Sequence, residues 1–172
     1  IEQFADRYRT KYDKLNTLIL NAGQMAGPLG WTKDGFENQM GVNHMGHFAL
    51  TMRLLNVMRQ TSEREQSEGR IVSVSSEGHR LGVINFDDMD WRKRPYEYWG
   101  SYGQSKLANI LFTSELNRRL KESGVNITAN SIHPGVIKTD LGRDGPWYFP
   151  AIHAVIGFVM YKSIPQGAAT QV

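Results

Sequence analysis

The chain has 172 residues, enough for one domain with a substantial apolar core and too few to predict two. Its formal charge of +3 comes from Lys and Arg residues scattered along the chain, so no basic face interleaved with aromatic residues predicts a nucleic-acid partner. The absence of cysteine excludes a disulfide framework, thiolate metal sites and a cysteine nucleophile.

The first half of the chain alternates helical and strand patterns. Apolar residues at helical spacing predict a helix over residues 1–12, and the short apolar run Leu15–Leu20, closed by Asn-Ala-Gly, is typical of a buried parallel strand. A loop rich in Gly and Pro over residues 27–30 precedes a second helix, predicted from about Phe36 to Met58. Residues Glu63–Gly69 are polar and are interpreted as a solvated loop.

The second half continues the alternation. We predict a strand over Arg70–Ser75, an irregular segment over Glu77–Gly100, a helix over Ser101–Glu122 and a third strand over Asn126–Ile132. Such alternation implies βαβ units and a parallel sheet covered by helices, which is an α/β fold. Residues 1–172 are interpreted as a single domain that is incomplete at both ends, because each end falls inside a helical pattern.

Tyr102 and Lys106 lie four residues apart in the predicted third helix, so both side chains share one face. A nearby ammonium group favours the phenolate and lowers the pKa of a tyrosine. A phenol adjusted in this way can exchange a proton with an alcohol or a carbonyl near neutral pH. The pair alone is a weak signal, because solvated helices often carry a Tyr and a Lys at this spacing.

Further motifs accompany the pair. Asn21–Gly23 closes the first strand, Ser75 and Ser76 close the second, Pro134–Thr139 follows the third, and Asn43 lies in the second helix. Ligands bind at the carboxyl ends of the strands in open α/β sheets. In this order and spacing the motifs resemble the short-chain dehydrogenase/reductase family over essentially the whole chain, which implies a Rossmann-like doubly wound parallel sheet.

Three segments are most similar to the retinol-dehydrogenase-like branch of that family, which includes WW-domain oxidoreductases and plant relatives. They are INFDD at 84–88, SYGQSKLANILF at 101–112 and SIHPG at 131–135. The resemblance implies an NAD(P)-dependent oxidoreductase that interconverts an alcohol and a carbonyl by hydride transfer. The apolar stretch Tyr148–Met160 lies where the family has a flap over the substrate, which would favour a lipophilic substrate such as a retinoid, steroid or aldehyde; a plain core helix is the alternative.

The resemblance assigns four catalytic roles. Tyr102 would be the general acid and base, and Lys106 would lower the pKa of Tyr102 and bind the nicotinamide ribose. Ser76 would hold the substrate oxygen; it is preferred to Ser75 because the active serine of the family is the second of the pair. Asn43 would kink its helix and hold a water that connects Lys106 to solvent.

The resemblance also assigns residues to the cofactor, for which NADP(H) is favoured over NAD(H). On the adenosine side they are Asn21, Ala22 and Gly23, with Gly23 allowing close approach of the backbone. On the nicotinamide side they are Tyr102, Lys106, Pro134, Gly135, Val136 and Thr139. No metal is expected, because His44 and His47 lie three residues apart on a helix without a third ligand. His79 and His133 are interpreted as structural histidines.

The family's Gly-rich cofactor turn is missing from this chain, together with the residue that selects NAD or NADP. Gly23, Gly27 and Gly30 mimic its spacing, but Pro28 removes a required N–H and no apolar helix follows. We interpret these glycines as an ordinary loop and the chain as the catalytic portion of the domain. Leu15–Leu20 would then be an uncovered edge strand, and we expect poor solubility and no cofactor binding from the chain as given.

Two other hypotheses compete with this one. A non-catalytic short form acting as an interaction module would use the helices around Phe36–Met58 and Tyr102, by which family members dimerise. A sugar-nucleotide epimerase shares the Tyr-Lys pair but does not account for the motifs at Asn21–Gly23 and Pro134–Thr139. A homodimer and a peripheral membrane contact remain hypotheses about partners, and the cytoplasm or an intracellular membrane is the favoured location.

Overall fold

The structure is a computed structural model that describes residues 1–137, 141 and 162–171. Its centre is a three-stranded sheet in the order β1-β2-β3, in which all the strands are parallel. The strands are β1 (Thr17–Leu20), β2 (Gly69–Val74) and β3 (Ile127–Ile132). Each agrees with a predicted strand to within two residues, so the predicted parallel α/β fold is confirmed, with a partial sheet.

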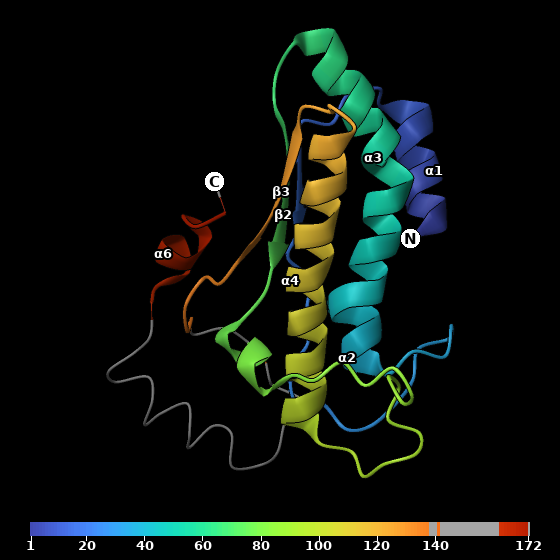
Figure 1. Cartoon of the computed structure of the whole chain (residues 1–172), viewed down its shortest axis with the longest axis vertical. Helices are drawn as coiled ribbons and strands as arrows, with labels where there is room; N and C mark the ends of the chain where they lie inside the picture. Colours follow the sequence, from blue (N-terminus) through green and yellow to red (C-terminus); the bar gives the residue numbers. More distant parts are fainter. Residues whose placement is uncertain (138–140, 142–161, 172) are drawn as a thin grey trace.

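Three helices lie together on one side of the strands (Figure 1). They are α1 (Glu2–Lys11), α3 (Gly46–Glu65) and α4 (Tyr98–Glu122). The short helix α6 (Ile164–Ala168) lies on the opposite side of the strands. Its Ser163 and Gln166 form a capping box, which explains why a helix begins there.

The core lies between the sheet and the three long helices. Alternate residues of the strands point toward the helices, as the period of two along a strand requires. The buried cluster consists of Ala5, Leu18, Leu20, Leu54, Met58, Ile71, Leu116, Leu120, Ile127 and Ala129. The core thus joins the carboxyl half of α4 to the strands, and the amino half of α4 lies beyond the apolar cluster.

The second predicted helix is longer than expected and is not uniform. It begins with α2 (Asn38–Met40), widens into a π-helical turn, η1 (Gly41–Met45), and continues as α3. The prediction of a loop from Glu63 was wrong at its start, because α3 runs to Glu65. Thr61 and Ser62 are buried there, and an Arg59–Glu63 ion pair spans one turn.

A short 3₁₀ helix, η2 (Glu77–Leu81), follows β2 within the segment predicted to be irregular. Among the described residues no helix is both long and apolar enough to cross a membrane. The predicted flap Tyr148–Met160 and the cofactor residue Thr139 lie outside the described residues.

Candidate active site

Tyr102 and Lys106 lie near the start of α4 and share one face of it, as predicted. Both side chains are buried, with 4% of Tyr102 and 3% of Lys106 exposed. The Lys106 ammonium nitrogen is 5.6 Å from the centroid of the Tyr102 ring. It also donates a hydrogen bond to the carbonyl oxygen of Val74, the last residue of β2, at 2.9 Å.

The start of α4 is unusual because its buried residues are mostly polar. They include Ser101, Tyr102, Gln104, Ser105, Lys106 and Asn109. Buried polar groups are retained where hydrogen bonds satisfy them, and several of these bonds go to β2 and to the π-helical turn. The amino half of α4 therefore builds a site rather than an apolar core.

The two serines after β2 point in different directions. Ser75 is buried, and its hydroxyl donates to the backbone carbonyl of Lys106 at 2.9 Å, so it fastens the strand end to α4. Ser76 begins η2, where its hydroxyl oxygen accepts from the Gly78 N–H, and its side chain also hydrogen-bonds that of Tyr102. This arrangement agrees with the preference for Ser76 over Ser75 as the residue beside the phenol.

Burial dominates the electrostatics of the pair. It raises the pKa of the Tyr102 phenol, and the hydrogen bond from Ser76 acts in the opposite direction. Burial also lowers the pKa of Lys106 to about 8. The sequence predicted a lowered pKa for Tyr102; the structure differs because loss of solvent around the phenol outweighs the favourable neighbour.

Asn43 lies in the π-helical turn and is completely buried. Its amide holds Gln24, in the loop after β1, by two hydrogen bonds: Oδ1 accepts from the Gln24 N–H at 2.9 Å and Nδ2 donates to the Gln24 carbonyl at 3.0 Å. Nδ2 is also 2.9 Å from the Ser105 hydroxyl oxygen on α4. The helix expected to kink at Asn43 has a π-helical turn there, and such turns are frequent at functional sites.

The glycine assigned to the cofactor approaches the same cluster. A Cβ atom on Gly23 would lie 3.2 Å from Asn43 Oδ1 and 3.7 Å from Lys106 Nζ. Gly135 has a φ of +91°, where an L side chain is strained, and a Cβ there would meet the Lys162 side chain at 2.8 Å. A side chain would therefore be crowded at Gly23 and strained at Gly135.

Four other predicted cofactor residues are exposed or half-buried. Asn21 is exposed, and its Oδ1 accepts from Gln171 Nε2 at 3.4 Å. Ala22 and Val136 are exposed, and Pro134 is half-buried. The glycines interpreted as an ordinary loop behave as one, because the next helix begins only at Asn38.

Glu37 is a buried carboxylate that organises this region and that the sequence motifs did not point to. Glu37 accepts from the backbone N–H groups of Gln39 and Met40 at 3.0 and 2.9 Å and so caps α2. It also accepts from the hydroxyls of Ser101 at 2.7 Å and Tyr96 at 3.1 Å. Because Ser101 precedes Tyr102, Glu37 holds the start of α4 against the π-helical segment.

The histidines near the site are structural in their contacts. His79 Nδ1 lies 2.7 Å from the carbonyl oxygen of Ser76. Burial lowers the pKa of His47 to about 4, with the charge of Lys106 as the second cause. Within the described residues no group of three or more His, Cys, Asp or Glu side chains could hold a metal ion.

The fold and the site together define a Rossmann-like α/β protein in which a buried Tyr-Lys pair meets Ser76 at the carboxyl ends of parallel strands. A family described as enoyl-(acyl carrier protein) reductase matches residues 1–157. The short-chain dehydrogenase TIC 32 A of Brassica napus is 42% identical over 172 residues, covering 99% of this chain and 53% of that protein. The chain belongs to the short-chain dehydrogenase/reductase family, in its retinol-dehydrogenase-like branch.

Other relatives support the same family. Human retinol dehydrogenase 13 is 47% identical over 143 residues, covering 83% of this chain and 41% of that protein. The crystal structure of an uncharacterized protein from Mycobacterium paratuberculosis is 46% identical, with a TM-score of 0.67, over 81% of this chain and 49% of that one. The Pseudomonas aeruginosa RhlG/NADP complex shares the fold, with a TM-score of 0.69 at 23% identity, over 98% of this chain and 62% of that one. This chain spans about half the length of the curated relatives.

Proposed function

We propose that this chain carries the catalytic residues of a nicotinamide-dependent oxidoreductase that interconverts an alcohol and a carbonyl. One observation carries the proposal: Tyr102, Ser76 and Lys106 meet in one cluster at the end of β2. A phenol that is hydrogen-bonded to a hydroxyl and stands beside an ammonium group is suited to proton transfer at a carbonyl oxygen. The relatives described above are named dehydrogenases, which favours this reaction over that of a sugar-nucleotide epimerase.

The residues around the cluster fit a nicotinamide cofactor. At Gly23 a side chain would crowd Asn43 and approach Lys106, so the glycine leaves space for a group beside the ammonium. Asn21, Ala22 and Gly23 would hold the adenosine side of the cofactor. Pro134, Gly135, Val136 and Thr139 would hold the nicotinamide side, with Tyr102 and Lys106 facing its ribose. When bound, the cofactor supplies the hydride, and NADP(H) is the form that the resemblance to the retinol-dehydrogenase-like branch favours.

The protein's own groups would control the proton. In reduction, Tyr102 Oη gives its proton to the substrate oxygen, and the Ser76 hydroxyl donates a hydrogen bond to the same oxygen as negative charge develops. The Lys106 ammonium stabilises the phenolate that remains. Asn43 fixes the Gln24 backbone beside Lys106, and a water held there would return the proton from solvent.

Lipophilic alcohols and carbonyls are the substrates we favour. Relatives at 47% and 37% identity are named retinol dehydrogenase and polyprenol dehydrogenase. In this chain the Trp99 ring packs edge-on to the Tyr102 ring with centroids 6.4 Å apart, and 39% of Trp99 is exposed. An exposed indole beside the reactive phenol favours an apolar substrate body.

The outer surfaces of α3 and α4 favour a second copy of the chain as a partner. Phe48 and Met52 on α3 and Leu111 on α4 are exposed apolar side chains, which favours pairing of two copies through these helices. This surface is also what the interaction-module hypothesis would use. A peripheral membrane contact would serve delivery of a lipophilic substrate.

Replacing Tyr102 with Phe tests the proposed chemistry. In the full-length protein with NADPH and retinal, Tyr102→Phe is expected to lower kcat by a factor of about 10³, because the proton donor is lost. NADPH binding, followed by fluorescence titration, is expected to change less than about twofold. The matched control is Tyr12→Phe, at an exposed tyrosine that follows α1, which is expected to leave both quantities unchanged. Retained turnover in Tyr102→Phe would rule out this mechanism.

A further inference from the structure

Asn109 lies on α4, close to one turn beyond Lys106, and its side chain is completely buried. Its Nδ2 donates a hydrogen bond to the carbonyl oxygen of Val74 at 3.3 Å. Lys106 Nζ donates to the same oxygen at 2.9 Å. A carbonyl oxygen has two lone pairs, so the amide and the ammonium occupy the two acceptor positions of one atom.

A histidine on the neighbouring helix fixes the orientation of the Asn109 amide. His44 Nδ1 lies 3.0 Å from Asn109 Oδ1. Because Nδ2 of Asn109 donates to Val74, its Oδ1 must accept, and His44 Nδ1 therefore carries the proton. Burial lowers the pKa of His44, which keeps the ring neutral.

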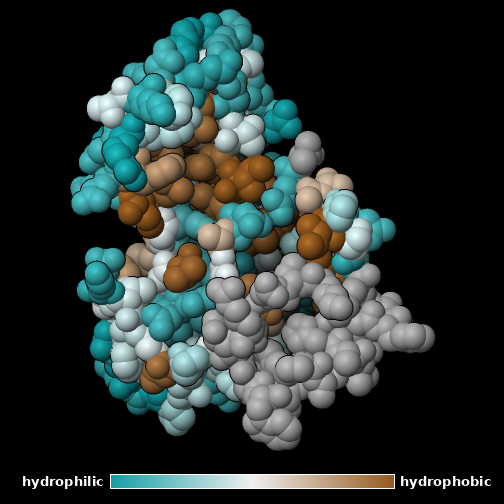
Figure 2. All heavy atoms as spheres, turned by 180° about the vertical axis from the view of Figure 1, so that it is seen from behind, coloured by the Kyte–Doolittle hydropathy of each residue, from teal (hydrophilic) through white to brown (hydrophobic). Residues whose placement is uncertain are grey.

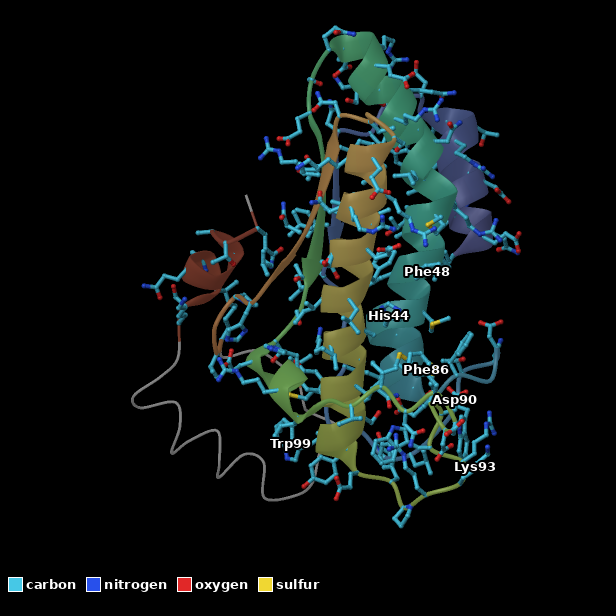
Figure 3. All side chains as sticks on the ribbon, in the orientation of Figure 1. His44, Phe48, Phe86, Asp90, Lys93 and Trp99 are labelled. Carbon is cyan, nitrogen blue, oxygen red and sulfur yellow. The ribbon has the colours of Figure 1, made fainter. Side chains whose placement is uncertain are left out.

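The His44 ring is itself held by its neighbours. Its centroid is 5.9 Å from that of Phe112 on α4 and 6.4 Å from that of Phe48 on α3. His44 and Phe48 lie about one turn apart along the continuous helix of η1 and α3 (Figure 3). A chain of contacts thus runs from this aromatic group through Asn109 to the carbonyl that binds Lys106.

We propose that Asn109 is a positioning residue for Lys106, and that His44 holds the Asn109 amide in place. By occupying one lone pair of the Val74 oxygen, Asn109 leaves the ammonium a single direction of approach. This keeps Lys106 beside Tyr102 rather than free to swing along the strand end. The inference rests on the proposed function, in which Lys106 acts on Tyr102, and it adds two residues outside the Tyr-Lys-Ser cluster.

Among the residues that the structure describes, few titratable groups face Lys106. Tyr102 lies on the same helix, His47 faces it from α3, and His44 stands behind Asn109. From the strand side it meets the carbonyl of Val74, with the uncharged hydroxyl of Ser76 beyond. His47 is neutral near pH 7, because its pKa is about 4. A carboxylate placed at position 109 would therefore be a new charge directly beside the ammonium.

The first test measures the titration of Lys106 directly and does not depend on catalytic turnover. Lysine labelled with ¹³C at Cε is incorporated into the full-length protein, and the resonance of Lys106 is identified by its loss in Lys106→Met. In Asn109→Asp the titration midpoint of this resonance is expected to rise by at least about one pH unit, because a carboxylate favours the charged lysine. The matched control is Asn117→Asp, also on α4, where Asn117 Oδ1 accepts from the Ala129 N–H at 3.1 Å.

An equal midpoint in Asn109→Asp and Asn117→Asp would overturn the positioning role, while leaving the proposed function intact. That function is decided separately by turnover in Tyr102→Phe.

A second measurement uses catalysis and does not depend on the aspartate variant folding. His44→Phe removes the donor to Asn109 Oδ1 and is expected to lower kcat/KM for retinal about tenfold. His44→Gln retains an N–H donor and is expected to restore at least half of the lost activity. Equal activities of the Phe and Gln variants would contradict the role given to His44 in holding the amide.

Discussion

Lys106 places an amino group where water is almost completely excluded, with only 3% of the residue exposed. Burial disfavours the charged form of a lysine, and one hydrogen bond to the Val74 carbonyl offsets only part of this cost. The pKa of Lys106 falls to about 8 for this reason. Keeping the Lys106 ammonium buried beside the Tyr102 phenol therefore lowers the stability of the folded chain.

This cost predicts how stability depends on pH. The pKa of Lys106 is about 8 in the folded chain and about 10.4 in an unfolded one. Between these values the unfolded chain binds more protons, so stability rises with pH and the cost is fully present below pH ~8. Lys106→Met is expected to raise the free energy of unfolding at pH 7 by on the order of 2 kcal/mol and to flatten the rise between pH ~8 and ~10.

Urea denaturation of the wild type and of Lys106→Met at pH 7, 8.5 and 10 measures this effect. Lys121→Met, at an exposed position near the end of the same helix, is the control and should follow the wild type. A Lys106→Met protein that is less stable than the wild type at pH 7 would show that hydrogen bonding, not desolvation, dominates at this site.

Residues differ in how well the sequence predicts them. The spacing of Tyr102 and Lys106 predicted a shared helix face, whereas their roles and the choice of Ser76 over Ser75 came from the resemblance to the family. Glu37 and Asn109 were not found, because the partners that give them a role, Ser101 and Val74, lie 64 and 35 residues away in the chain. Local patterns hold no trace of such contacts.

At the scale of elements, the site depends on how closely η2 approaches α4. A Cβ atom on Gly103 would lie 2.6 Å from the Gly78 carbonyl oxygen and 2.7 Å from the Gly82 nitrogen, and one on Gly82 would lie 2.2 Å from the Gly103 oxygen. These are backbone atoms that a rotamer change cannot move away. The backbone contact sets the distance between Ser76, at the start of η2, and Tyr102, beside Gly103.

Gly103→Ala should therefore damage the site by separating two elements. Overpacking of this kind costs about 1–3 kcal/mol of stability, and we expect kcat in the full-length protein to fall at least tenfold as Ser76 moves from Tyr102. Thermal unfolding and steady-state kinetics measure the two effects. Gly27→Ala is the control, because a Cβ there meets nothing within 4 Å. Unchanged kcat in Gly103→Ala would mean that η2 adjusts without moving Ser76.

Elements with regular periodicity were predicted well, and the others were not. β2 and β3 match to within a residue at each end because parallel strands are continuous apolar or small runs between clear breaks. The 3₁₀ helix η2 was missed because five residues are too few to show a period. The end of α3 was placed too early because Thr61 and Ser62 are residue types common in loops. In the structure both are buried, and their hydroxyls donate hydrogen bonds to the carbonyls of Val57 and Asn126.

At the scale of the whole molecule, the long helices cover only one side of the sheet. β1 is an edge strand of the described sheet, and it lies toward the back of the molecule in Figure 1. Seen from behind, apolar side chains gather on that side and are bordered by hydrophilic surface (Figure 2). Ile19 of β1 is 43% exposed, while its neighbours Leu18 and Leu20 are buried on the helix side.

An exposed apolar edge strand is a template for association with other chains. We expect this 172-residue chain to associate through β1, and Ile19→Thr to reduce the association, because threonine retains the strand preference and removes apolar surface. Light scattering at increasing protein concentration should give a lower apparent mass for Ile19→Thr than for the wild type. Leu20→Thr is the matched control: it alters the core face of the same strand, and it should lose about 2–4 kcal/mol of stability without lowering the apparent mass. If Ile19→Thr and the wild type associate equally, the contact lies elsewhere, and the exposed residues of α3 and α4 become the surface to test.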